Sequence, residues 1–95
     1  MTTTPTSQET QALRAELLLR IRNYLQEERQ IDPERVQEGT DFREDLELDS
    51  LDLAAIAMQF EDEYGLTLDD ERVLTIKTVG EAINLVIELK QEETE

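Results

Sequence analysis

Apolar residues recur at helical spacing in four stretches of the 95-residue chain. In the longest stretch, residues 8–28, they fall three and four positions apart, which is the period of a helix with one buried face. A broad apolar face of this kind is typical of a helix that packs in a bundle. The expected inward residues are Leu13, Leu17, Ile21 and Tyr24, flanked by Leu18 and Leu25.

A second helix is expected over residues 50–64, ending at Gly65 in the left-handed conformation that glycine adopts easily. Its start can be capped by Asp49 or by Ser50, because either short side chain can accept a hydrogen bond from an unpaired backbone N–H. The expected inward residues are Leu53, Ile56, Ala57, Phe60 and Tyr64.

Two further helices follow. A short one is expected over residues 69–74, capped by Asp69 or Asp70, and a longer one over 79–91. Capping boxes are predicted at Thr78 with Glu81, and at Thr6 with Glu9 before the first helix. The inward residues of the last helix are expected to be Val79, Ala82, Ile83, Val86 and Leu89. No strand pattern competes, so the predicted fold is an all-α four-helix bundle with three longer helices and a short third one.

The segment between the first two helices, residues 29–49, has no helical period. Pro33 fits the first turn of a short helical piece capped by Asp32, and residues 39–41 fit a turn. Five apolar residues indicate a long loop packed across the bundle: Ile31, Val36, Phe42, Leu46 and Leu48. We expect residues 1–7 to form a disordered tail, 8–92 a single domain, and 93–95 a frayed end.

The chain contains neither cysteine nor histidine. It therefore lacks a thiolate nucleophile, the usual general base near neutral pH, and the commonest transition-metal ligand. We expect no catalytic residue and no metal site in a chain so poorly equipped for its own catalysis. Any thioester chemistry would need sulfur from an attached group.

The formal net charge is −15, which argues against binding to nucleic acids or anionic membranes and favours basic partners. The acidic residues are concentrated around Ser50, since residues 31–76 hold fifteen Asp and Glu against three arginines. We see no signal peptide and no apolar run long enough to span a bilayer. A cytoplasmic monomer is the expected state.

The sequence around Ser50 resembles the acyl carrier protein family. The resemblance rests on Asp49-Ser50-Leu51-Asp52, preceded by Asp45-Leu46 and followed by Met58 and residues 61–65. It extends in family order through residues 42–46, 65–71 and 78–82. Three positions depart from the family pattern: Glu47 stands where many members have glycine, Asp69 where many have proline, and Ala55 where many fatty-acid carriers have an acidic residue.

The resemblance implies that a phosphopantetheinyl transferase attaches 4′-phosphopantetheine to the Ser50 hydroxyl, using coenzyme A and Mg²⁺. An acyl group would then be carried as a thioester on the distal thiol and could be sheltered in the bundle. The implied partners are acyl-transferring, condensing and reducing enzymes with basic docking patches. The residues expected to meet them are Asp45, Glu47, Asp49, Asp52 and Asp62, around an apolar centre of Leu51 and Met58.

Fatty acid biosynthesis is the pathway most closely resembled, and polyketide, modified-lipid and aminoacyl carriers remain alternatives. An acidic helical adaptor, with Ser50 only a cap, is a different class and would keep its function after Ser50→Ala. A calcium-binding protein is disfavoured because residues 41–52 and 69–80 lack EF-hand ligand spacing. An enzyme using Asp69 and Asp70 would need a pocket constellation that the sequence does not show.

Overall fold

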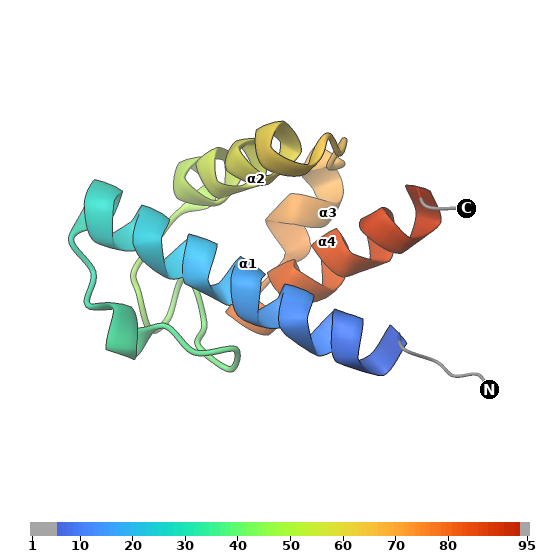
Figure 1. The fold of residues 1–95 in the computed structure, drawn as a ribbon. Helices are drawn as coiled ribbons and strands as arrows, with labels where there is room; N and C mark the ends of the chain where they lie inside the picture. Colours follow the sequence, from blue (N-terminus) through green and yellow to red (C-terminus); the bar gives the residue numbers. More distant parts are fainter. Residues whose placement is uncertain (1–5, 94–95) are drawn as a thin grey trace.

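The computed structural model describes residues 6–93, which form four α-helices and one short 3₁₀ helix (Figure 1). The predicted all-α bundle is confirmed. The described part leaves out residues 1–5 of the predicted tail and residues 94 and 95. It also leaves out the side chain of Thr6, so the predicted Thr6–Glu9 capping box lies outside it. The elements are α1 (Thr6–Arg29), η1 (Pro33–Arg35), α2 (Ser50–Tyr64), α3 (Asp70–Thr75) and α4 (Val79–Glu93).

The ends of α2 match the prediction, whereas α1 and α4 are longer than expected. Helix α1 begins at Thr6, two residues before the predicted start, and ends at Arg29. Helix α4 continues to Glu93, two residues beyond the predicted end. Helix α3 begins at Asp70 because Asp69 is its N-cap and accepts a hydrogen bond from the Glu71 N–H at 3.0 Å.

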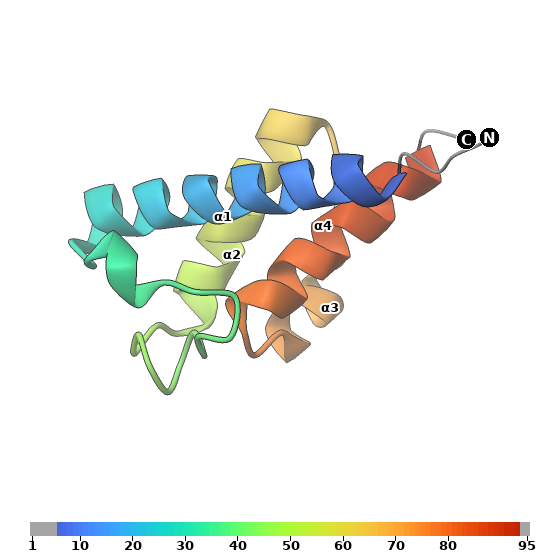
Figure 2. The ribbon, with the colours of Figure 1, turned by 60° about the horizontal axis from the view of Figure 1, so that its bottom comes forward.

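Helices α1 and α2 run in opposite directions, and α4 lies between α1 and α3 (Figures 1 and 2). Within α1, Leu17, Ile21 and Leu25 are buried, whereas Leu13 and Tyr24 are only partly buried. The inward face is therefore rotated slightly from the predicted one. Helix α4 also buries Leu85 and Ile87, which the predicted single face did not include. A helix with neighbours on more than one side buries more than one stripe.

The long loop before α2 is pinned to both α1 and α4. All five predicted apolar anchors of this loop are buried. On one side, Arg22 Nε donates to the Val36 carbonyl at 2.8 Å. On the other side, the loop forms three backbone hydrogen bonds to residues 77–80, at 2.9, 3.0 and 2.7 Å. These contacts fix the segment that leads into Ser50.

The predicted capping box at Thr78 forms with one of its two expected hydrogen bonds changed. Thr78 Oγ1 accepts from the Glu81 N–H at 3.2 Å, as expected. The Glu81 carboxylate, however, accepts from the Lys77 N–H at 2.8 Å and not from the N–H of Thr78. The Lys77 carbonyl accepts from the Phe42 N–H of the loop at 2.9 Å, so Lys77 contacts both the loop and Glu81.

Candidate functional site

Ser50 is the first residue of α2 and is exposed to solvent. Asp49, the residue before it, is the N-cap: its Oδ1 accepts from the Asp52 N–H at 3.1 Å. Asp52 Oδ2 in turn accepts from the Asp49 N–H at 3.2 Å, which completes a capping box. The structure thus decides between the two predicted caps in favour of Asp49. The Ser50 hydroxyl makes no hydrogen bond within the described part of the chain, so it is accessible for covalent attachment.

The start of α2 stabilises the ionised form of Asp49. The pKa of Asp49 is lowered chiefly by the Asp52 N–H, with further contributions from the Asp52 side chain, the Leu51 N–H and the charge of Arg29. A carboxylate that accepts from free N–H groups at a helix N-terminus is stabilised in this way. Ser50 is therefore preceded by a carboxylate that stays charged at neutral pH.

Hydrogen bonds within the preceding loop hold its shape. Asp41 Oδ1 accepts from the N–H groups of Arg43 and Glu44, both at 2.8 Å, and Asp45 Oδ2 accepts from the Asp41 N–H at 2.8 Å. Glu47 has a φ of 59°, in the left-handed region that favours glycine. This conformation explains in physical terms why a glycine suits the position.

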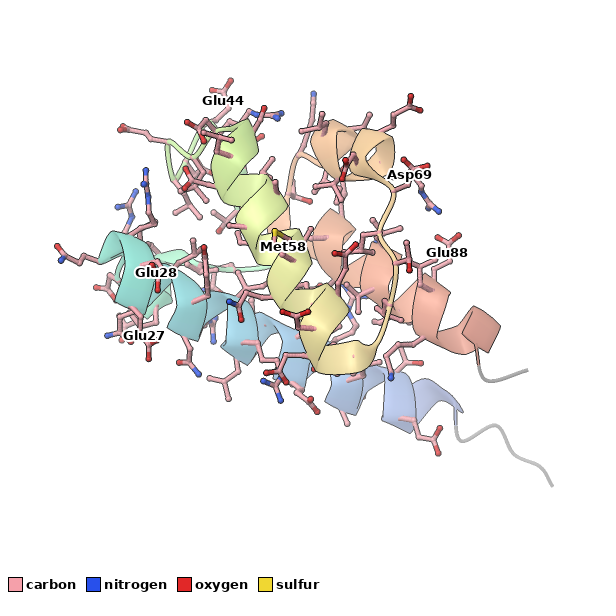
Figure 3. The ribbon with its side chains drawn as sticks, turned by 90° about the horizontal axis from the view of Figure 1, so that it is seen from above. Glu27, Glu28, Glu44, Met58, Asp69 and Glu88 are labelled. Carbon is pink, nitrogen blue, oxygen red and sulfur yellow. The ribbon has the colours of Figure 1, made fainter. Side chains whose placement is uncertain are left out.

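Six of the predicted docking residues lie on the surface around α2. Leu51 is 80% exposed and Met58 62% exposed, although both are apolar. Figure 3 looks onto α2 from outside, with Met58 on the viewer's side and Glu44 in the loop at the helix start. The acidic members of this set are all exposed: Asp45, Glu47, Asp49 and Asp62.

Asp52, the seventh predicted docking residue, lies in different surroundings from the other six. Its side chain is only 17% exposed and lies 3.4 Å from the guanidinium of Arg29, the last residue of α1. With its capping contact to Asp49, Asp52 joins two helices. No local sequence pattern marks Arg29, because its partner Asp52 lies far away along the chain.

The opposite end of α2 is also tied to α1, through Tyr64. The Tyr64 hydroxyl donates to Glu16 Oε2 at 2.7 Å and accepts from Arg20 Nε at 2.9 Å. The Lys90 ammonium of α4 lies 5.0 Å from the centre of the Tyr64 ring. Burial, followed by the bond to Glu16, raises the pKa of Tyr64 to about 12. The helical period predicted that Tyr64 faces the core, but a local pattern could not supply these partners.

The part of the chain that the structure describes offers neither a metal-ligand cluster nor a membrane-spanning helix. No group of three or more His, Cys, Asp or Glu side chains among residues 9–90, whose side chains the structure describes, is arranged to hold a metal ion. No helix in this part of the chain is both long enough and apolar enough to cross a membrane.

Residues 19–86 match the protein family described as "Phosphopantetheine attachment site", and this range contains Ser50. An acyl carrier protein from Lactobacillus acidophilus is 34% identical over 71 residues, which cover 75% of this chain and 89% of the relative. The chain belongs to the acyl carrier protein family. The crystal structure of an acyl carrier protein from Thermotoga maritima superposes with a TM-score of 0.76 at 33% identity, covering 85% of this chain and 94% of that one.

Acyl carrier proteins are carriers and not enzymes, and their cofactor is phosphopantetheine. The α2 start fits this group, because it presents an exposed hydroxyl that is not used as a cap. The resemblance recognised in the sequence is therefore confirmed at the level of family, fold and cofactor.

Proposed function

We propose that Ser50 is the attachment residue for 4′-phosphopantetheine and that a separate phosphopantetheinyl transferase loads it from coenzyme A. The observation that carries this proposal is that Asp49 caps α2, while Ser50, the next residue, is exposed and is not used as a cap. The bound group would supply the thiol that a chain without cysteine lacks. Ser50 would hold the arm, and the pinned loop would keep that point of attachment in place.

The intact mass of the protein tests this assignment. We expect the parent, incubated with coenzyme A, Mg²⁺ and a broad-specificity transferase, to gain one phosphopantetheine. Ser50→Ala should gain none, while Ser7→Ala, which alters the chain's other serine, should load like the parent. Loading of Ser50→Ala would move the site elsewhere. No loading of a folded parent would favour the adaptor function over the carrier.

The pathway proposed is fatty acid biosynthesis, in the cytoplasm. The exposed carboxylates around α2 support it, because they suit transient contact with a series of basic enzymes. Polyketide, modified-lipid and aminoacyl carriers are the alternatives, since Ala55 replaces an acidic residue on the same helix. Holo-protein supplied with acyl-transferring and condensing enzymes of fatty acid synthesis should support chain extension. Loading by an amino acid activating enzyme, without extension, would reject this pathway.

Docking is proposed to use two kinds of residue on the outer side of α2. The exposed Leu51 and Met58 would form an apolar centre, and the carboxylates Asp45, Glu47, Asp49 and Asp62 would attract basic patches. Contacts between exposed charges chiefly raise association rates and weaken with salt. Asp52 is left out, because its carboxylate is mostly buried and engaged by Asp49 and Arg29.

The rate of loading by the transferase, measured as kcat/KM against salt, tests the docking surface. Asp62→Asn should lower kcat/KM at low salt and have little effect at high salt, whereas Met58→Ala should lower it at both. Glu9→Gln removes an equal charge near the start of α1, at the far end of the molecule from Ser50, and serves as the control. Equal effects from Glu9→Gln and Asp62→Asn would reject a localised surface.

The space between α2, α3 and α4 bears on whether an acyl chain could be sheltered. It is an apolar cavity of about 20 Å³, lined by residues that include Phe42, Ile56 and Leu85. That is room for about one water molecule. An acyl chain would enter only if the helices moved apart, so the proposed carriage does not depend on a preformed pocket.

A further inference from the structure

Arg29 places a positive charge beside the two carboxylates that bracket Ser50. It is the last residue of α1, whose end lies next to the start of α2 (Figure 1). Its Nη2 lies 3.4 Å from Asp52 Oδ2. The Arg29 charge also helps to lower the pKa of Asp49, although the Asp52 N–H is the main cause. Ser50 therefore sits between two acidic residues that both interact with the same cation.

The guanidinium of Arg29 makes fewer hydrogen bonds than those of the other arginines of α1. Arg14 and Arg20 donate to side chains of neighbouring elements, and Arg22 donates to a backbone carbonyl of the loop. The Arg29 side chain is 47% exposed and donates no hydrogen bond to residues 9–90, apart from its long ion-pair contact to Asp52. Since a guanidinium carries five N–H donors, Arg29 can accommodate another acceptor.

A phosphodiester on Ser50 would bring a further negative charge into an acidic site. Like charges at such short range repel one another, and a nearby cation offsets this repulsion. A planar guanidinium suits the purpose, because its fork of donors matches two phosphate oxygens. The capping box does not involve Arg29, because Asp52 accepts from the Asp49 N–H within it. Asp52 can therefore release Arg29 without disrupting the start of α2.

We propose that Arg29 is the counter-ion of the phosphodiester that joins the phosphopantetheine arm to Ser50, and that it turns from Asp52 to the phosphate when the arm is attached. This inference rests on the proposed function of Ser50. Arg29 would act as a positioning residue that holds the root of the arm and takes no part in acyl transfer.

The test compares apo- and holo-protein for the parent, Arg29→Gln and Arg43→Gln. Arg43 is a matched control: it is exposed in the acidic loop before Ser50 and forms no ion pair with another described residue. Urea unfolding at low salt measures how far attachment of the arm changes the unfolding equilibrium constant. The measured quantity is the ratio of the unfolding equilibrium constants of the holo- and apo-protein. We expect this ratio to be about threefold higher in Arg29→Gln than in the parent, which corresponds to the loss of an exposed ion pair. Arg43→Gln should leave this ratio unchanged.

The ³¹P resonance of the holo-protein gives a second readout that does not depend on unfolding. Its chemical shift should move in Arg29→Gln, stay in place in Arg43→Gln, and return toward the parent position in Arg29→Lys. An unchanged resonance together with an unchanged apo-to-holo ratio would show that Arg29 only links α1 to α2, and would overturn the inference. Equal effects of both glutamine variants would also overturn it, because general charge would then suffice.

Intact mass separates this failure from failure of the proposed function. If no arm is attached at Ser50, the attachment proposal is wrong and the Arg29 inference falls with it. If the arm is attached but neither readout responds to Arg29→Gln, only the Arg29 inference is wrong.

Discussion

Asp49 and Asp52 satisfy each other's backbone N–H groups across the first turn of α2, at 3.1 and 3.2 Å. Ser50 lies between them in the sequence and takes no part in the capping box. The group that stabilises the helix and the group proposed to carry the arm are therefore neighbouring but separate residues. A substitution can alter one role without the other.

The first prediction separates these two roles in the apo-protein. Asp49→Ala removes the N-cap acceptor and should lower the free energy of unfolding by about 1 kcal/mol. Ser50→Ala removes an exposed hydroxyl and should change it by less than about 0.5 kcal/mol. Urea unfolding of both variants checks this. A Ser50→Ala loss as large as that of Asp49→Ala would show that the serine hydroxyl is needed for the helix start.

The second prediction concerns the left-handed backbone at Glu47. A side chain at φ of 59° is strained in a way that glycine is not, and the Glu47 side chain is exposed. Glu47→Gly relieves this strain but also increases the entropy of the unfolded chain, which opposes the gain. The net result should be a rise of up to about 1 kcal/mol in the free energy of unfolding. Glu44→Gly, in the same loop but without a positive φ, should lower it. Thermal or urea unfolding distinguishes the two, and a loss in both would refute the strain.

The third prediction concerns the contact between the loop and α4. The Gly80 N–H donates to the Glu38 carbonyl at 2.7 Å, and a Cβ at Gly80 would lie 3.0 Å from that oxygen. Gly80→Ala should push the loop away and lower the free energy of unfolding by about 1–3 kcal/mol. Gly39→Ala has open space around it and should be close to neutral. Similar unfolding midpoints for the two alanine variants would contradict a tight contact.

The fourth prediction concerns alkaline pH. Burial and the bond to Glu16 raise the pKa of Tyr64 from 10.0 to about 12, so the folded protein keeps a proton that the unfolded chain loses. The associated stability is present below pH 10 and is lost as the pH rises toward about 12. Tyrosinate absorbance should show a late step that disappears in Tyr64→Phe and remains in Tyr24→Phe. Ionisation of Tyr64 at its ordinary pKa would mean that its hydroxyl is not held by Glu16 and Arg20 of α1.

Much of the site could be predicted because its signals are local. The helical period and Gly65 located α2 to the residue, since a left-handed C-cap and an amphipathic stripe depend on near neighbours. The exposure of Leu51 and Met58 followed from the same period. The choice between Asp49 and Ser50 as cap could not be made this way, because both carry a suitable oxygen at the same junction.

Other features depended on how the helices came together. The expected single buried stripe of α4 missed Leu85 and Ile87, because a period cannot show that a helix has several neighbours. The predicted docking role of Asp52 did not anticipate its contact with Arg29, which depends on where α1 ends relative to α2. The capping box at Thr78 is altered because Glu81 accepts from the Lys77 N–H and not from the Thr78 N–H.

The sequence by itself determined the four helices, the packed loop, the acidic character around Ser50 and the family, since each is encoded in periodicity, capping residues or a local motif. Only the tertiary structure decided which groups at the helix ends are engaged. Asp49 closes the capping box, Arg29 reaches Asp52, and Tyr64 is held between Glu16 and Arg20. The contacts of Arg29 and Tyr64 join side chains that are distant in the sequence. They form only because the packing of α1 against α2 brings those side chains together, and a local pattern does not contain that information.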